Sequence, residues 1–237
     1  MSKKTISKEK ILLEYTPMAI TAIGILICAI IFEQMLIKIL PLFFSLFIQL
    51  YMSRANRIAF LLGAANSVIY IIGYVMEGVY GTAMSTLFGI VLLLIAYFRW
   101  KKQSVGKATK FSAFTYKQRA VLAVFVSALW AASSFTLLAM GGKAVVLDGL
   151  VLVIGFAVPI LNVRAYVESP TLNLIGFTAQ AIIWIQLIVV EKNYASTTYL
   201  ISTIYNLYTI SRTFIRWRHL YNEQNKKATD DASLVAN

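Results

Sequence analysis

Apolar residues dominate eight stretches of this chain, and short polar segments separate them. Each stretch is roughly as long as a helix must be to cross a hydrocarbon layer about 30 Å thick. The pattern therefore predicts an all-α integral membrane protein with about eight transmembrane helices. The stretches cover residues 12–32, 36–52, 58–76, 81–98, 120–140, 144–163, 172–190 and 194–215.

The polar segments divide the chain into regions. Residues 1–11 form a short charged leader, and residues 99–119 form a basic loop that separates two hydrophobic halves. Residues 218–237 form a polar tail, and we expect residues 220–237 of it to be disordered because they offer little apolar surface to bury.

The two halves are related in sequence. Residues 61–81 align without gaps to residues 175–195, with six identities in 21 positions. Apolar composition accounts for some of these identities, but it does not supply polar matches such as Glu77 with Glu191. The alignment indicates an internal duplication.

The duplicated unit contains three helices. It covers residues 36–98 in the first half and 144–217 in the second, with residues 120–140 as a connector and 12–32 as an extra N-terminal helix. Equivalent segments lie four membrane crossings apart. Because four is even, the two repeats run parallel, an arrangement found in transporters whose sites lie between the repeats.

Lysine and arginine residues are distributed unequally between the two ends of these helices. Of the 22 in the chain, 19 fall on the face that holds both termini and 3 on the other. The positive-inside bias places such a face in the cytoplasm. We therefore predict a multi-pass protein of the cell membrane with both termini cytoplasmic. The three exceptions are Lys38, Lys143 and Lys192.

The composition argues against several other classes of protein. At 59% hydrophobic and 14% charged residues, the chain is more apolar than a soluble domain, in which about a quarter of residues are charged. The net charge of +12 lies beside apolar runs, where anionic lipid explains it without nucleic acid. Cys28 and His219 are the sole residues of their types, and no P-loop motif occurs. We predict no metal, no cofactor and no catalytic residues, so the protein is not expected to be an enzyme.

Polar or indole side chains lie near the centres of four predicted spans. They are Asn66, Trp130, Gln180 and Asn206. An amide without a partner is costly in hydrocarbon, so these side chains should face protein or a cavity. Their similar depth favours a common polar chamber that binds substrate. Hydrogen bonding between neighbouring helices is the alternative.

Aromatic residues accompany the amides at helical spacing. Tyr70 follows Asn66 by four residues and Trp184 follows Gln180 by four, so each pair shares a helix face. An amide beside an aromatic wall suits a flat, uncharged or cationic heteroaromatic ligand. Tyr205, beside Asn206, is a further candidate. For any one tyrosine, simple packing is the alternative.

Three side chains nearer the helix ends are candidates for a gate or mouth. Asp148 lies about one turn inside the outer end of its predicted span, and Arg212 lies about one turn inside the inner end. Tyr74 extends the stripe of Tyr70. The alternative for both charged residues is that they reach the membrane interface.

Several short motifs resemble those of the Pnu-type vitamin transporters. They are the segment IAFLLGAANSVIY at residues 58–70, then Glu77-Gly78-Val79-Tyr80, and a closing Trp100-Lys101-Lys102. The resemblance covers residues 36–218. It implies a three-plus-one-plus-three helix core related to the SWEET sugar transporters, and a homotrimeric assembly.

The resemblance also implies a function. It indicates facilitated uptake of a vitamin or nucleoside by alternating access, best nicotinamide riboside or a related heteroaromatic riboside, which phosphorylation then traps in the cell. Thiamine, riboflavin and deoxynucleosides are alternatives within the family, and a SWEET-like sugar carrier or an integral-membrane enzyme are alternatives outside it. The implied site residues are Asn66, Tyr70, Gln180 and Trp184, with residues around Asn206 and Arg212. Where the nicotinamide riboside subgroup is rich in tryptophan early in the seventh helix, this chain has Phe177, which we count among the substrate-binding candidates.

Overall fold

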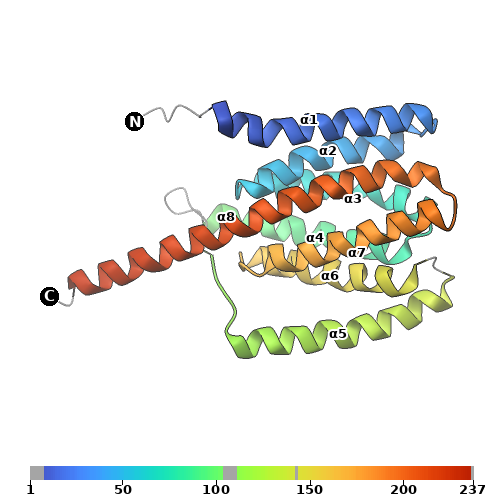
Figure 1. Cartoon of the computed structure of the whole chain (residues 1–237). Helices are drawn as coiled ribbons and strands as arrows, with labels where there is room; N and C mark the ends of the chain where they lie inside the picture. The colour runs from blue at the N-terminus through green and yellow to red at the C-terminus, as the bar shows by residue number, and fades with distance from the viewer. Residues whose placement is uncertain (1–7, 104–110, 142–143, 236–237) are drawn as a thin grey trace.

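The computed structural model describes residues 8–103, 111–141 and 144–235, which form eight α-helices and one 3-10 helix (Figure 1). The predicted all-α membrane fold is confirmed. Parts of the predicted leader, loop and tail, and Lys143, fall outside these ranges. The helices are α1 (Lys8–Ile31), α2 (Leu36–Ser53), α3 (Ile58–Met76), α4 (Tyr80–Gln103), α5 (Tyr116–Ala139), α6 (Val145–Val163), α7 (Ser169–Val189), η1 (Tyr194–Ser196) and α8 (Thr197–Val235).

The basic loop predicted for residues 99–119 is shorter in the structure. α4 continues to Gln103, and α5 begins at Tyr116. Thr115 starts α5 through a capping box. Its hydroxyl accepts a hydrogen bond from the backbone N–H of Gln118, whose side chain accepts one from the N–H of Thr115. A polar capping signal thus starts the helix before its apolar run.

The polar tail is helical, so the prediction of disorder is wrong as far as Val235. α8 continues from the bundle as a long arm (Figure 1). Adding residues to an existing helix needs no new nucleus, which makes extension far easier than forming an isolated helix of the same composition.

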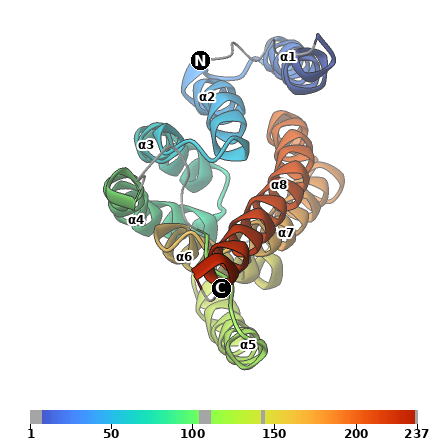
Figure 2. The ribbon, with the colours of Figure 1, turned by 90° about the vertical axis from the view of Figure 1, so that its left-hand side faces the viewer.

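Six helices form a closed ring around a central axis. Neighbours in the ring are α2, α3, α4, α6, α7 and α8, and α8 returns to α2. α3 therefore lies across the ring from α7, as the end-on view shows (Figure 2). The other two helices pack outside the ring, α1 against α8 and α2, and α5 mainly against α6.

The ring consists of two parallel three-helix repeats, α2–α4 and α6–α8, with α5 as the connector. A half-turn about the axis exchanges the α4–α6 contact with the α8–α2 contact, both of which are present. Turns at matched positions share an uncommon backbone conformation. Ala55 and Ala165 both have φ of 53°, and Gly78 and Lys192 have φ of 73° and 56°. Such recurrence, at three non-glycine positions and one glycine, supports the duplication.

Length and hydropathy identify seven of the described helices as candidate membrane spans, and α8 is the exception. α8 is part of the ring, and several of its polar side chains are buried against the neighbouring helices. Thr203, Thr209 and Thr213 are buried, and each donates its hydroxyl to the carbonyl four residues earlier. α8 runs alongside the other helices (Figure 1), so we count it as the eighth helix of the membrane bundle.

The two ends of the bundle differ in charge. One end, here called the basic end, carries Arg54, Arg164 and Arg212, and the start of α1 and the end of α8 lie on that side (Figure 1). The other, here called the opposite end, carries Glu77 and Asp148. This arrangement matches the predicted unequal distribution of basic residues between the two faces. Which face lies in the cytoplasm stays a prediction.

Candidate transport site on the axis between the repeats

Side chains from α3 and α7 fill the middle of the ring. Asn66 and Tyr70 come from α3, and their matched residues Gln180 and Trp184 come from α7. Asn66, Gln180 and Trp184 are buried, and Tyr70 packs against the same apolar core as Trp184. Because α3 and α7 face each other across the ring, the duplicated positions converge on the axis.

Four aromatic rings stack across this axis. The centroids of Tyr70 and Tyr74 are 5.2 Å apart with nearly parallel planes, and those of Trp184 and Tyr199 are 4.8 Å apart at 21°. Tyr74 joins the two pairs, with its centroid 6.4 Å from those of both Trp184 and Tyr199. One pair comes from each repeat, so the stack connects the repeats. These four rings are called the aromatic wall below.

Tyr199 was not among the predicted site residues. It precedes Asn206 by seven residues on α8 and therefore lies on the same helix face, a spacing that would have identified it. Gly73 of α3 makes room for it, because a Cβ at this position would lie 2.9 Å from the Tyr199 hydroxyl. That hydroxyl is buried and has no hydrogen-bond partner among the described residues.

Hydroxyl and amide groups border the aromatic wall. The hydroxyls of Ser45 on α2 and Ser202 on α8 lie 3.3 Å apart, and both interact with the hydroxyl of Tyr70. The side chain of Gln180 interacts with the hydroxyl of Tyr74. Polar groups of both repeats therefore lie near the hydroxyls of Tyr70 and Tyr74.

Two amide oxygens at this level have unused hydrogen-bonding capacity. Asn66 donates from its Nδ2 to the carbonyl of Pro41 at 2.9 Å. Its Oδ1 and the Oδ1 of Asn206 are buried without a partner among the described residues. Unpaired buried acceptors are costly, so a ligand that donates hydrogen bonds would be favoured here.

Two further predicted residues lie on the helices that form the site. Tyr205 is 2% exposed and donates to the carbonyl of Leu46 at 3.3 Å, so it links α8 to α2. Phe177 is half-buried on α7, one turn from Gln180 toward the basic end. A contact between Phe177 and a substrate stays a prediction.

Trp130 lies away from the axis, contrary to the prediction of a shared chamber. It belongs to α5, outside the ring, and its indole donates to the carbonyl of Val146 at 2.6 Å. A central position along a span indicates depth in the membrane. Lateral position depends on which neighbour the helix packs against, and the neighbour of α5 is the outer surface of α6.

A buried polar cluster joins the repeats at the opposite end. Glu77, at the end of α3, pairs with Lys38 of α2 at 2.7 Å and accepts a hydrogen bond from the Asn193 side chain at 2.6 Å. The Glu77 side chain is only 4% exposed. Because Asn193 follows α7, one carboxylate contacts both repeats.

Asp148 is also buried at the opposite end, where it caps α4. Its two oxygens accept hydrogen bonds from the backbone N–H groups of Gly81 and Thr82 at 2.8 and 3.0 Å, and from the Thr82 hydroxyl at 2.7 Å. A carboxylate satisfies the free N–H groups of a helix N-terminus and is favoured by the helix dipole. Asp148 therefore couples α6 to α4, and a role at the mouth of a pathway stays a prediction.

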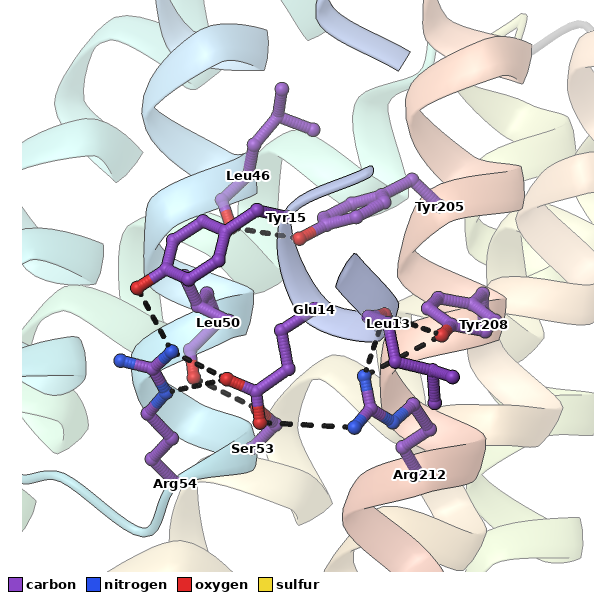
Figure 3. A network of polar contacts seen from close by, with 10 residues as sticks. All are labelled: Leu13, Glu14, Tyr15, Leu46, Leu50, Ser53, Arg54, Tyr205, Tyr208 and Arg212. Carbon is purple, nitrogen blue, oxygen red and sulfur yellow. Dashed lines mark hydrogen bonds and ion pairs between the residues drawn. The ribbon is translucent and has the colours of Figure 1, made fainter. Parts of the chain in front are cut away.

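At the basic end, Glu14 of α1 contacts both repeats (Figure 3). Its carboxylate pairs with Arg54, at the C-cap of α2, and lies 3.7 Å from Arg212 of α8. Arg54 also donates to the hydroxyl of Tyr15 at 3.1 Å. The hydrogen bonds to Tyr15 and Glu14 raise the pKa of Arg54 despite the opposing effect of burial, so Arg54 stays cationic.

Pro17 leaves one backbone carbonyl of α1 free to contact α8. Pro17 lacks an N–H group, so the carbonyl of Leu13 loses its helical donor. That carbonyl instead accepts hydrogen bonds from the hydroxyl of Tyr208 at 3.0 Å and from Nη1 of Arg212 at 3.1 Å (Figure 3). The predicted gate residue Arg212 is therefore held by α1, through both a carboxylate and a freed carbonyl.

Comparison with known proteins agrees with this architecture. A family model described as nicotinamide mononucleotide transporter matches residues 35–219, a segment that begins after α1. The crystal structure of the vitamin B3 transporter PnuC superposes with a TM-score of 0.71 and 16% identity, over 89% of this chain and 92% of that chain. At this identity the likeness shows the fold alone. No curated protein matches the chain. The predicted resemblance to the Pnu-type transporters is confirmed.

Proposed function

Because this chain belongs to the nicotinamide mononucleotide transporter family, we propose that it carries nicotinamide riboside or a related heteroaromatic riboside across the membrane. The coarser function, transport of a small molecule by a multi-pass membrane protein, follows from the family. The choice of solute comes from the chemistry of the axis.

The observation that carries this choice is the lack of positive charge at the aromatic wall. Aromatic rings, amides and hydroxyls surround the axis, and no lysine or arginine is among the buried polar and charged residues of the described chain. A mononucleotide would bring a phosphate into this surrounding. Burying an anion without a cationic partner is strongly unfavourable, so the site favours the riboside over its phosphate ester.

The rings and amides suit different parts of such a solute. A pyridinium ring gains from stacking on Tyr70, Tyr74, Trp184 or Tyr199, by up to about 2 kcal/mol when water is excluded. The unpaired oxygens of Asn66 and Asn206 would accept from a carboxamide or from ribose hydroxyls. These two amide oxygens, which have no partner among the described residues, would then gain hydrogen-bond donors from the solute.

Transport by alternating access requires each end of the axis to open in turn. The Glu77 cluster and the Glu14 cluster each join the two repeats, so we assign them as the closures of the opposite end and the basic end. In this proposal the basic end and both termini face the cytoplasm of the cell. Solute released there is trapped by phosphorylation, because the axis disfavours the phosphorylated product.

The alternatives differ in what they require of the axis. Thiamine, riboflavin and deoxynucleosides also present flat heteroaromatic rings to an aromatic wall. A SWEET-like sugar carrier would need hydrogen bonding more than stacking. The homotrimer and the SWEET relationship stay predictions from the resemblance.

The test is uptake into vesicles that contain the purified protein, with no ion gradient. Labelled nicotinamide riboside should equilibrate faster than in empty vesicles, and unlabelled mononucleotide should compete poorly. If no family substrate equilibrates faster than in empty vesicles, the transport proposal fails. Equal competition by the mononucleotide would refute the preference for the riboside.

Variants of α7 locate the site. Gln180→Ala should weaken riboside binding about tenfold, because it removes one hydrogen bond of about 1.5 kcal/mol from an enclosed site. Gln186→Ala is the matched control, since it removes the same group from another face of the same helix. Unchanged affinity in both Gln180→Ala and Trp184→Ala would show that these side chains only pack helices together.

A further inference from the structure

A lateral groove of about 480 Å³ lies outside the ring, with α5 and α7 as its sides and α6 as its floor. It exists because α5 packs mainly against α6 and leaves its flank toward α7 uncovered. The walls are apolar and include Leu122 and Val126 of α5, Ile154 of α6, and Leu172 and Ile175 of α7. No part of the transport site on the axis lines this groove.

One end of the groove carries positive charge. Arg119 of α5 pairs with Glu168, at the N-cap of α7, at 2.9 Å. Arg218 of α8 lines the same end, is exposed, and stacks on Phe214 with its Cζ 4.2 Å from the ring centroid. It forms no ion pair with another described residue. Two guanidinium groups against one carboxylate leave this mouth cationic.

The other end of the groove reaches Trp130, eleven residues beyond Arg119 on α5. Eleven residues of α-helix cover about 16 Å. Half of a hydrocarbon layer about 30 Å thick is about 15 Å. The groove therefore extends from the membrane surface at the basic end to the middle of the bilayer, the depth of one leaflet.

We propose that this groove binds an anionic phospholipid from the leaflet at the basic end. The phosphate lies at Arg218 and Arg119, and an acyl chain follows the apolar walls to Trp130. Charge complementarity selects an anionic headgroup over a zwitterionic one, because basic pockets between membrane helices hold anionic headgroups. The matching depth selects a lipid over a compact solute. The site is separate from the transported solute and does not depend on its identity.

The tryptophans of the chain make the occupant measurable. Trp100, Trp184 and Trp217 are each 1% exposed, whereas Trp130 lines the groove. The full chain is reconstituted in vesicles of phosphatidylglycerol and phosphatidylcholine, with bromine on the acyl chains of one lipid at a time. Bromine quenches indole fluorescence on contact. We expect the relative association constant, the ratio of phosphatidylglycerol to phosphatidylcholine binding at the groove, to be about five. One cationic side chain near an anionic lipid has an effect of this size. Trp130→Phe should remove the quenched component.

Two arginine variants on α8 test the assigned headgroup contact. Arg218→Gln should bring the relative association constant close to one. Arg216→Gln is the matched control, because Arg216 lies at the basic end but lines a different groove with Glu14 and Arg212. Equal quenching by the two lipids, or an unchanged preference in Arg218→Gln, overturns the proposal. If neither lipid quenches Trp130, the proposal is also overturned, and another chain would then be inferred to cover the groove.

Discussion

The two ends of the transport axis are each joined by one carboxylate that contacts both repeats, but these carboxylates differ in their surroundings. Glu77, at the opposite end, is 4% exposed and touches Lys38 and Asn193. Glu14, at the basic end, is 15% exposed, and both of its arginine partners are 33% exposed. Water and salt screen exposed charges, so we infer that the basic end separates at a lower free-energy cost than the opposite end.

The two closures also differ in where they lie along the chain. Glu77, Lys38 and Asn193 belong to the segment that the family model matches, whereas Glu14 lies on α1, before that segment. In the proposed mechanism, the opposite end is therefore closed by the core of the fold itself. The basic end would be closed by a helix packed outside the ring, and α1 would then adjust how readily this end opens.

The largest expected effect comes from removing the buried carboxylate. Glu77→Ala leaves the Lys38 amine and the Asn193 amide without a partner, which should lower the free energy of unfolding by about 3 kcal/mol. Thermal unfolding of the purified protein in detergent measures this change. Glu77→Gln should lose less, because its amide oxygen still accepts from Asn193. An unchanged midpoint in Glu77→Ala would show that the opposite end is not held by this cluster.

Glu14→Gln should have a smaller effect on stability, about 1 kcal/mol or less, because its ion pairs are partly exposed. The same loss lowers the cost of opening the basic end, so the initial rate of riboside uptake into vesicles should rise up to about fivefold. Glu223→Gln is the matched control, since Glu223 pairs with His219 on the exposed extension of α8. An uptake rate at or below that of the wild type would contradict a closing role for Glu14.

The two arginines should contribute unequally. Arg54 donates from two nitrogens to Glu14, whereas the nearest nitrogen of Arg212 is 3.7 Å from that carboxylate. Double-mutant cycles with Glu14→Gln should give a coupling of about 0.5–1 kcal/mol for Arg54→Gln and roughly 0.2 kcal/mol for Arg212→Gln. Thermal unfolding again measures both. A larger coupling to Arg212 would mean that Glu14 holds α8 more than α2.

Salt should produce the smallest change, and it should act at one end only. Raising the ionic strength from about 0.15 to about 1 M shortens the Debye length from about 8 to about 3 Å. Uptake by the wild type should therefore move slightly toward the rate of Glu14→Gln, whose own rate stays constant. A salt response of equal size in both proteins would place the screened interaction elsewhere.

Helical pattern and duplication explain why much of the site was predictable. Asn66 and Gln180 were identified as matched residues at mid-span, and parallel repeats place matched helices opposite each other about an axis. Tyr199 was missed because it has no matched aromatic in the first repeat. Trp130 was placed wrongly because depth along a helix carries no information about its lateral neighbours.

The sequence alone determines the helical spans, the face on which the basic residues lie and the duplicated polar positions. Hydrophobic length and charge act within each segment, so these features need no tertiary contacts. The partners of Glu14, Glu77 and Asp148 lie 39 or more positions away in the chain, and the shape of the ring brings them together. Only the tertiary structure shows that the lone helix α1 contacts both repeats at one end of the axis. Such contacts depend on which helix faces packed against each other, and that choice minimises buried unpaired polar groups over the whole bundle.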